Sequence, residues 1–226
     1  MRSETPAKSI TIENTRLEHA QQVYDTVRLA YGMRLDQPCA TCVNAEAVQD
    51  QLERFPEGQF VAVYHGPEGE EVVGMAATMR IHRPPTMKPR DWMDQIGSTG
   101  IANHKPDGVW LYGVEMAVRP AFRRQGTGTA LYKARFELVR RLNLQGWYAG
   151  GMLMGYHRYQ DQMMPREYGE KVIRREIVDP TVTMQMNRGF EAWEVIENYL
   201  PEAHAGNAAV LIVWENPDYR EEPNEE

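Results

Sequence analysis

Residues 114–131, VEMAVRPAFRRQGTGTAL, contain in order the signals of a strand, a turn and a helix. The run Val114 to Val118 is short and mostly apolar, which is typical of a strand, and Pro120 lacks the backbone N–H that a continuing strand would donate. Apolar residues recur at helical spacing from Leu131 onward, so a helix is predicted to begin close to Gly126. The first amides of such a helix have no acceptor within it. The segment therefore predicts a turn with unpaired backbone donors.

The residues of this turn favour an anion. Gly126 and Gly128 have no Cβ to obstruct a ligand, and glycine tolerates a positive φ. The dipole of the following helix and the charges of Arg123 and Arg124 attract negative charge. A phosphate group is therefore expected to bind here, mainly to the backbone.

Two common phosphate-binding motifs do not fit. A Walker loop needs a lysine directly after its last glycine, but none follows Gly128 until Lys133. The dinucleotide fingerprint Gly-x-Gly-x-x-Gly fails because Leu131 occupies the position of its third glycine. What remains is Arg123-x-x-Gly126-x-Gly128, preceded by the strand.

This remaining pattern resembles the acetyl-coenzyme A motif of the general N-acetyltransferase (GNAT) superfamily, Gln/Arg-x-x-Gly-x-Gly/Ala. The resemblance implies that backbone groups of Met116, Ala117 and Val118 bind pantetheine and the thioester carbonyl. It also implies a pyrophosphate site in the turn, made of Arg123, Arg124, Gln125, Gly126, Thr127, Gly128 and Thr129. Weaker support for the resemblance comes from Asn187-Arg188-Gly189-Phe190, which is like the Asn-x-Gly-Phe often found late in this fold.

Several other segments resemble one particular group within this superfamily. They look like the GNAT domains fused to carbon-nitrogen hydrolases, and this chain is expected to be such a domain standing alone. These segments are Leu111 to Glu115, Gly150-Gly151 with Gly155-Tyr156, Glu176 to Pro180, and Asn198 to Pro201.

Composition limits the class of protein. The 226 residues suit one domain, expected over 1–226, with a core of about 10–215 and an acidic tail at 216–226. The net charge of −7 and the dispersed lysines and arginines argue against general nucleic-acid binding. No signal-type N-terminus is present, and the apolar run Ala208 to Trp214 is too short to span a bilayer, so a cytoplasmic protein without membrane contact is expected.

The two cysteines form Cys39-Ala-Thr-Cys42 in a connecting segment. A zinc site would need two further ligands, and none is in evidence nearby, so no metal is expected. The two residues are expected to be ordinary thiols.

The chain predicts an α+β fold in the order β, α, α, β, β, insertion, β, α, β, insertion, α, β, β. The insertions are 82–108 and 155–179. The resemblance adds the geometry: a mixed, mostly antiparallel sheet of six to seven strands, with splayed central strands, flanked by helices. Predicted strands are 9–13, 60–64, 72–79, 114–118, 147–153, 191–196 and 208–214; predicted helices are 17–31, 45–54, 127–142, 165–175 and 182–187.

Glu115 is the first candidate for a catalytic residue. It lies in an otherwise apolar strand, where a carboxylate in a partly dry cleft can have a raised pKa and accept a proton from an ammonium substrate. The alternative is a glutamate paired with an arginine on the other face of the strand. Tyr112, of opposite pleat phase, is the second candidate. No general acid is assigned, because Gln185 stands where many GNAT enzymes have a tyrosine.

The residues of the insertions are open to two interpretations. Tyr156, Tyr159 and Tyr168 could donate a proton to the leaving thiolate, but loop tyrosines more often serve packing. His104 and His157 could face the acceptor, but lone loop histidines are usually surface residues.

The expected function is an acetyl-coenzyme A-dependent N-acetyltransferase that moves the acetyl group to a small-molecule or protein amine by direct attack in a ternary complex. The alternative is a non-catalytic sensor of coenzyme A or acyl-coenzyme A, or an interaction module. A homodimer is left open, since the strand Ala208 to Trp214 could pair between subunits or lie inside the sheet.

Overall fold

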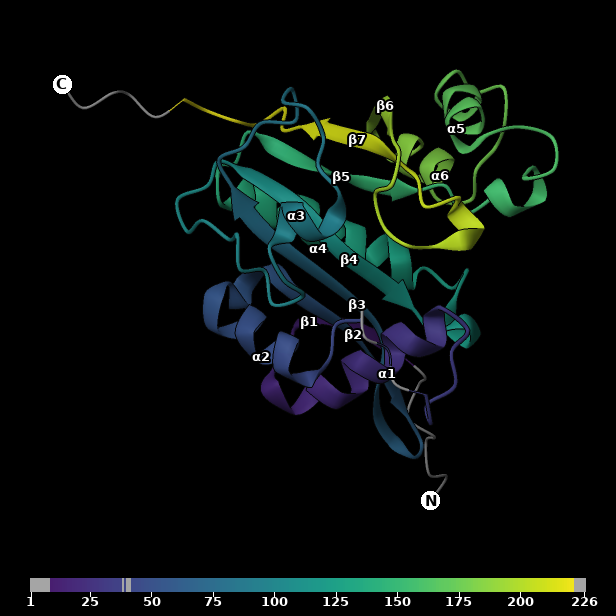
Figure 1. Cartoon of the computed structure of the whole chain (residues 1–226). Coiled ribbons are helices and arrows are strands. Elements are labelled where there is room, and N and C mark those ends of the chain that lie inside the picture. The colour runs from purple at the N-terminus through teal and green to yellow at the C-terminus, as the bar shows by residue number, and fades with distance from the viewer. Residues whose placement is uncertain (1–8, 38, 40–41, 222–226) are drawn as a thin grey trace. The chain divides into compact units, whose positions relative to one another are not determined.

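The computed structural model describes residues 9–37, 39 and 42–221, and Figure 1 shows its elements along the chain. The strands are β1 Ser9–Asn14, β2 Gln59–Gly66, β3 Gly69–Ile81, β4 Trp110–Val118, β5 Gly146–Met152, β6 Glu191–Ile196 and β7 Ala209–Glu215. The helices are α1 Ala20–Ala30, α2 Ala45–Arg54, α3 Trp92–Ile96, α4 Thr127–Arg141, α5 Pro165–Ile173 and α6 Val182–Met186.

The strands form one seven-stranded sheet in the order β1-β2-β3-β4-β5-β7-β6. β4 and β5 are parallel, whereas β1–β2, β2–β3, β5–β7 and β6–β7 are antiparallel. The predicted α+β fold with a mixed, mostly antiparallel sheet is therefore confirmed. The β4–β5 ladder joins three residue pairs and ends at Tyr112 and Tyr148, as expected for strands that separate.

The chain forms two compact units. Unit 1 contains the described residues of Met1–Met79, Gly97–Pro106 and Val114–Leu138, and unit 2 contains those of Arg80–Ile96, Asp107–Gly113 and Val139–Glu226. Three elements, β3, β4 and α4, continue from one unit into the other.

In unit 1, helix α1 is tied to strand β3. The Thr26 hydroxyl donates to the Val72 carbonyl at 2.9 Å, and the Val72 N–H donates to Gln22 Oε1 at 2.8 Å. Leu131 of α4 reaches Gly74, whose missing Cβ would lie 3.3 Å from the leucine side chain. These contacts hold α1 and α4 against β3. Helix α2 begins where Asn44 accepts the Ala47 N–H at 2.8 Å, a local cap that explains its confirmed start.

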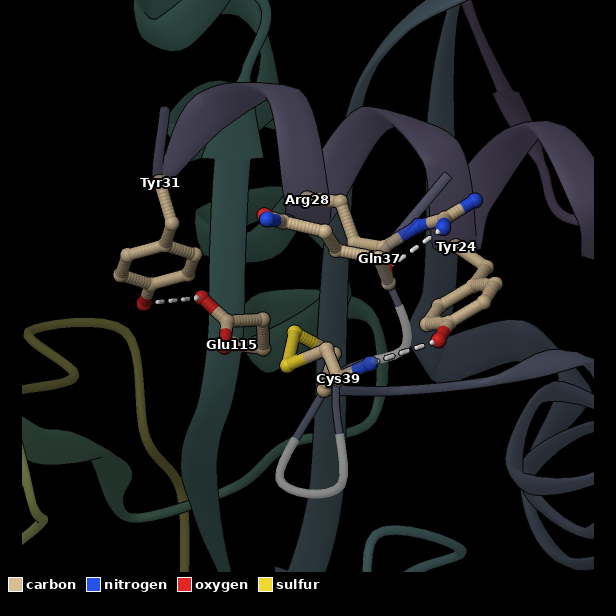
Figure 2. The surroundings of a disulfide bond; sticks show 7 residues. Tyr24, Arg28, Tyr31, Gln37, Cys39 and Glu115 are labelled. Carbon is tan, nitrogen blue, oxygen red and sulfur yellow. Dashed lines mark hydrogen bonds between the residues drawn. A yellow bond between two sulfur atoms is a disulfide. The ribbon is translucent and has the colours of Figure 1, made fainter. Parts of the chain in front are cut away.

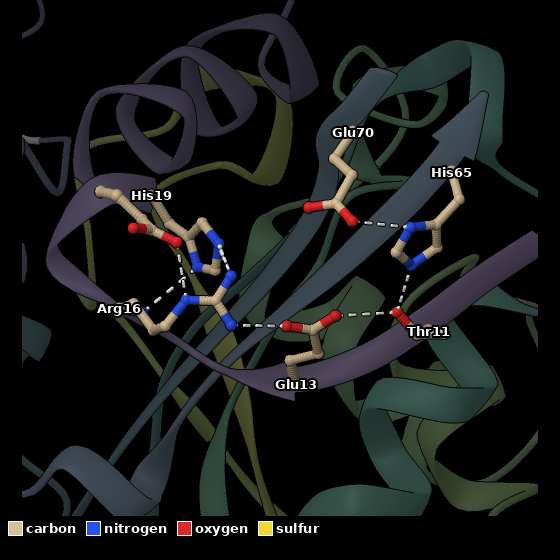
Figure 3. A network of polar contacts seen from close by, with 7 residues as sticks. Thr11, Glu13, Arg16, His19, His65 and Glu70 are labelled. Carbon is tan, nitrogen blue, oxygen red and sulfur yellow. Dashed lines mark hydrogen bonds and ion pairs between the residues drawn. The ribbon is translucent and has the colours of Figure 1, made fainter. Parts of the chain in front are cut away.

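The edge strand β1 carries a network of polar contacts (Figure 3). Thr11 bonds to Glu13 at 3.0 Å and to the His65 ring at 2.8 Å, and His65 also lies 3.1 Å from Glu70. Arg16 pairs with Glu13 at 2.9 Å. Charged side chains along an edge discourage pairing with a strand of another molecule.

In unit 2, strand β7 lies between β5 and β6. Its residues are buried from Ala209 to Val213. Of the two places considered for this strand, the interior of the sheet is the one found. The second insertion forms α5, where Pro165 occupies the first turn as predicted.

The two cysteines correct one prediction: they are not thiols but form a Cys39–Cys42 disulfide with a Cα–Cα distance of 5.4 Å, within the range that a disulfide can bridge. The Cys39 N–H donates to the Tyr24 hydroxyl at 3.0 Å. Figure 2 shows the bond with Tyr24, Tyr31 and Glu115 around it. Spacing alone could not show that the two sulfur atoms lie within bonding distance.

Candidate functional site

The glycine turn is built from the end of β4, a 3-10 helix at Pro120–Phe122 and the start of α4. Two side chains hold it together: the Gln125 amide donates to the Ala121 carbonyl at 2.7 Å, and the buried Thr127 hydroxyl donates to the Phe122 carbonyl at 3.1 Å. The first hydrogen bond of the helix runs from the Ala130 N–H to the Gly126 carbonyl at 2.9 Å. The helix therefore begins where the sequence predicted.

Among the described residues, the backbone amides around the two glycines have no backbone acceptor. Within the described part of the chain, no amide from Arg124 to Gly128 donates to a backbone carbonyl. These amides come at the N-terminus of a 15-residue helix, where the helix dipole favours negative charge. The turn can therefore bind an anion through its backbone.

The two glycines differ in what they require. Gly126 has a φ of +87° and open space where a Cβ would stand, so its backbone conformation demands glycine. A Cβ on Gly128 would meet only the Met116 Cε, at 3.5 Å, an ordinary contact. Packing against the described residues of unit 1 therefore does not require glycine at position 128.

The two arginines also differ. The Arg123 guanidinium donates to the Val118 carbonyl at 3.0 Å and to the Ala30 carbonyl at 2.6 Å, and thereby joins the ends of β4 and α1. Arg124 is exposed, has a φ of +60° and makes no side-chain hydrogen bond or ion pair among the described residues. Arg124 is therefore the side chain that can move to a ligand, while Arg123 shapes the turn. Thr129 is exposed in the first turn of α4.

The strand before the turn has some backbone groups already paired. The Met116 N–H donates to Glu115 Oε1 at 3.0 Å, and the Val118 carbonyl accepts from Arg123. Ala117 is buried, and the Met116 sulfur accepts from Arg135 at 2.7 Å. Some polar backbone groups of this segment are therefore already hydrogen-bonded within unit 1.

Glu115 is half-buried, and Figure 2 shows its carboxylate meeting the Tyr31 hydroxyl from the end of α1. That hydroxyl donates to Oε1 at 3.2 Å. Burial raises the pKa of Glu115, and the hydrogen bonds from Met116 and Tyr31 oppose the rise without cancelling it. Glu115 has no ion pair among the described residues, so the arginine-paired alternative is not found. Tyr31 was not predicted as a partner of Glu115, because the two residues lie 84 positions apart.

In unit 2, Tyr112 is buried, and its hydroxyl lies 2.7 Å from the Tyr199 hydroxyl. Burial first, and then the neighbouring Tyr199, raise the pKa of Tyr112 well above its usual value. The phenol is therefore protonated at neutral pH. The Tyr148 ring meets Tyr112 edge to face, with 5.3 Å between the ring centroids. Neither Tyr199 nor Tyr148 was predicted as a site residue: Tyr199 lies in the segment Asn198 to Pro201, which supported only the resemblance, and Tyr148 lies in a predicted strand.

Comparison with known proteins now identifies the family. A family model described as "Acetyltransferase (GNAT) family" matches residues 21–153, more than half of the chain. The chain belongs to the acetyltransferase (GNAT) family.

Two curated relatives from Bacillus subtilis (strain 168) match this GNAT chain. The "Probable hydrolase YhcX" is 39% identical over 175 residues, which cover 77% of this chain and 33% of the relative. The chain thus spans about a third of that protein. The "Uncharacterized N-acetyltransferase YkwB" is 26% identical over 175 residues, covering 77% of this chain and 76% of the relative.

Among solved structures, the "GphF GNAT-like decarboxylase in complex with isobutyryl-CoA" superposes with a TM-score of 0.74 at 17% identity, covering 91% of this chain and 99% of that one. At this identity the likeness shows the GNAT fold.

Several other residues considered in this GNAT chain make packing contacts, whereas His157 is exposed. His104 is buried and stacks on Phe55, with 4.8 Å between the ring centroids. The Tyr168 hydroxyl donates to the buried Asp179 at 3.1 Å, and the Tyr156 hydroxyl donates to the Met163 carbonyl at 3.1 Å. Gln185 is buried beside Gly151. These contacts match the packing interpretation for Tyr156 and Tyr168.

No group of three or more histidine, cysteine, aspartate or glutamate residues that could hold a metal ion occurs among the described residues. In the same part of the chain, no helix is long and apolar enough to cross a membrane.

Proposed function

We propose that the chain is an acetyl-coenzyme A-dependent N-acetyltransferase that acts on an amine of a small molecule or a protein. The observation that carries the proposal is the turn at the N-terminus of α4, whose amides from Arg124 to Gly128 have no backbone acceptor among the described residues. Membership of the acetyltransferase (GNAT) family and the relative named as an N-acetyltransferase support it.

The residues of the turn suit the pyrophosphate of coenzyme A. The amides from Arg124 to Thr129 would donate to its oxygens, and the Arg124 guanidinium would add a charge-assisted contact. Arg123 would act indirectly, through the carbonyls that it joins. Backbone groups of Met116, Ala117 and Val118 would bind the pantetheine arm. No metal takes part.

In the proposed reaction, the carboxylate of Glu115 accepts a proton from the ammonium form of the acceptor, directly or through water. The neutral amine then attacks the thioester carbon, so that a C–N bond forms as the C–S bond breaks. The attacking nitrogen releases its second proton to solvent as the amide forms, and the thiolate leaves and takes a proton from solvent. The raised pKa of Glu115 makes its conjugate base stronger than an ordinary glutamate.

The test is thiol release from acetyl-coenzyme A with a panel of amines, with the full chain as enzyme. The proposal expects amine-dependent release with the acetylated amine as product. Tight binding of acetyl-coenzyme A without amine-dependent release would instead favour the sensor, and absence of binding would favour an interaction module.

The proposal also covers the extent of the domain and its location in the cell. It takes residues 1–226 as one transferase domain, with its core at about 10–215, acting in the cytoplasm. Disulfides are rare in the cytoplasm. A Cys39–Cys42 bond that is present in the cell would therefore contradict the proposed location without bearing on the activity.

A further inference from the structure

A pocket of unit 2 lies where the β3–α3 connection passes strands of the sheet. It is lined by Arg83, Pro84, Pro85, Met87, Pro89, Arg90, Gln95, Tyr112, Tyr148, Gly150, Ile196, Tyr199 and Leu211. Most of these residues are apolar or aromatic, and three are prolines, whose fixed φ makes a stiff wall. The enclosed volume is about 20 Å³, so that only a small group fits inside and the body of an organic ligand would lie against the outer part of this lining.

The charged residues of the lining are both arginines, Arg83 and Arg90. This is unexpected on a chain with a net charge of −7. A positive pocket on a negative protein concentrates small anions at that point of its surface.

Arg83 is held in place by its own loop. Its guanidinium donates to the Lys88 carbonyl and to the Met87 sulfur, the latter at 3.4 Å. Its backbone carbonyl accepts from the Tyr148 hydroxyl at 2.7 Å, which fastens the loop to β5. The guanidinium is therefore positioned before any ligand arrives, so little entropy is lost on binding.

Arg90 is exposed and makes no hydrogen bond or ion pair among the described residues. Burial raises the pKa of Tyr148, while the charges of Arg83 and Arg90 act in the opposite direction, which places both charges within electrostatic reach of that hydroxyl. The acidic neighbour Asp91 acts on Tyr112, and its carboxylate accepts the Asp94 N–H at 2.9 Å in the first turn of α3. No carboxylate belongs to the lining itself.

We propose that this pocket binds an organic carboxylate: a small molecule with an apolar or aromatic body against the tyrosines and prolines and its carboxylate on Arg83 and Arg90. A planar carboxylate matches the fork of a guanidinium, and the apolar lining offers few of the extra donors that a phosphate would need. The binding that it predicts requires no acetyl transfer, and the contacts that it uses all belong to unit 2.

The test is calorimetric titration of the full chain, without coenzyme A, with phenylacetate, phenylacetamide, phenethylamine and phenyl phosphate. Phenylacetate should bind with a Kd about tenfold or more below that of the amide, since charge-assisted hydrogen bonds are about twice as strong as neutral ones. The amine should not bind. Phenylacetate no tighter than the amide, no binding of any probe, or tightest binding of the amine or the phosphate ester would overturn the proposal.

Variants locate the binding. In Arg83→Gln/Arg90→Gln the carboxylate should bind no better than the amide, and in Arg90→Glu it should bind worse than in the single Arg90→Gln. Arg174→Gln, an equal loss of charge at an exposed residue of unit 2, should leave the Kd unchanged. If the double variant does not fold, the exposed Arg90→Gln alone decides, because an unchanged carboxylate preference there contradicts the proposal.

Discussion

At the scale of the residue, the proposed role of Glu115 as a base can be tested directly. If it accepts the proton of the amine, kcat/KM should rise with pH as its carboxyl ionises, at a pH above the usual range for glutamate. Glu115→Gln should lose this rise and lower the neutral-pH rate by about 10²-fold or more. The measurement is thiol release against pH. Glu137→Gln, at an exposed glutamate of α4, is the control, and an unchanged profile in Glu115→Gln contradicts the role.

The same pKa predicts an effect on stability that needs no substrate. A carboxyl whose pKa is higher in the folded than in the unfolded protein favours folding when protonated, so that stability is lost as pH rises through the folded pKa. Glu115→Gln should therefore have a higher free energy of unfolding than the wild type at pH 7, and the difference should vanish below pH of about 4, where both forms are neutral. Urea unfolding at the two pH values measures it. A variant less stable at pH 7 would show that the hydrogen bonds outweigh burial.

Which residues could be predicted depended on whether their partners are near in sequence. Glu115 was identifiable as a lone charge in an apolar strand. The Tyr31 hydroxyl that bonds it comes from the end of another helix, and the Tyr199 hydroxyl that meets Tyr112 lies 87 positions away. Contacts of this range depend on tertiary packing, which hydrophobic period and motif spacing do not encode.

At the scale of the element, the start of α4 can be tested at Gly128. Since a Cβ there makes only an ordinary contact with Met116, Gly128→Ala should fold and have an unchanged or slightly higher Tm. If a pyrophosphate lies against this turn, the added methyl should raise the Kd for acetyl-coenzyme A by about tenfold. Lys133→Ala, on the exposed side of the same helix, is the matched control. An unchanged Kd in Gly128→Ala would place the pyrophosphate elsewhere.

The loop between α1 and α2 provides a second test. The protein, denatured without reductant, should expose no reactive thiol to a thiol reagent, and two after reduction, because Cys39 and Cys42 are paired. Two thiols before reduction would contradict the disulfide and restore the expectation drawn from the sequence. Purification under anaerobic, reducing conditions, followed by the same titration, separates a bond formed in the cell from one formed in air.

Element boundaries differed in predictability for a physical reason. The helix 45–54 and the strand 191–196 match α2 and β6 because an asparagine cap and flanking glycine mark their ends locally. Strand β3 runs over Gly69–Ile81, longer than the predicted 72–79 at both ends. At its start, pairing with β2 holds polar residues such as Glu70 and Glu71 in the ladder. The helix α3 was missed, since it has only five residues and lies in a proline-rich segment.

At the scale of the whole molecule, the question is whether the two units unfold together. Strands β3 and β4 and helix α4 each contain residues of both units. If one unit unfolded, each of these elements would lose part of its length. One cooperative transition is therefore expected. The five tryptophans, Trp92, Trp110, Trp147, Trp193 and Trp214, all belong to unit 2. Their fluorescence reports on that unit, whereas far-ultraviolet circular dichroism reports on both.

The decisive variant is Asp179→Ala, in unit 2. The buried carboxylate accepts from the Gly155, Thr181 and Val182 amides and from the Tyr168 hydroxyl, so its removal leaves several buried donors without an acceptor. The loss should be about 2–4 kcal/mol. If the units unfold as one, fluorescence and circular dichroism midpoints in urea should fall by the same amount and still coincide. A fluorescence midpoint that falls alone, with a second transition left in the dichroism, would show that unit 1 is stable without unit 2 and that the single-domain proposal is wrong.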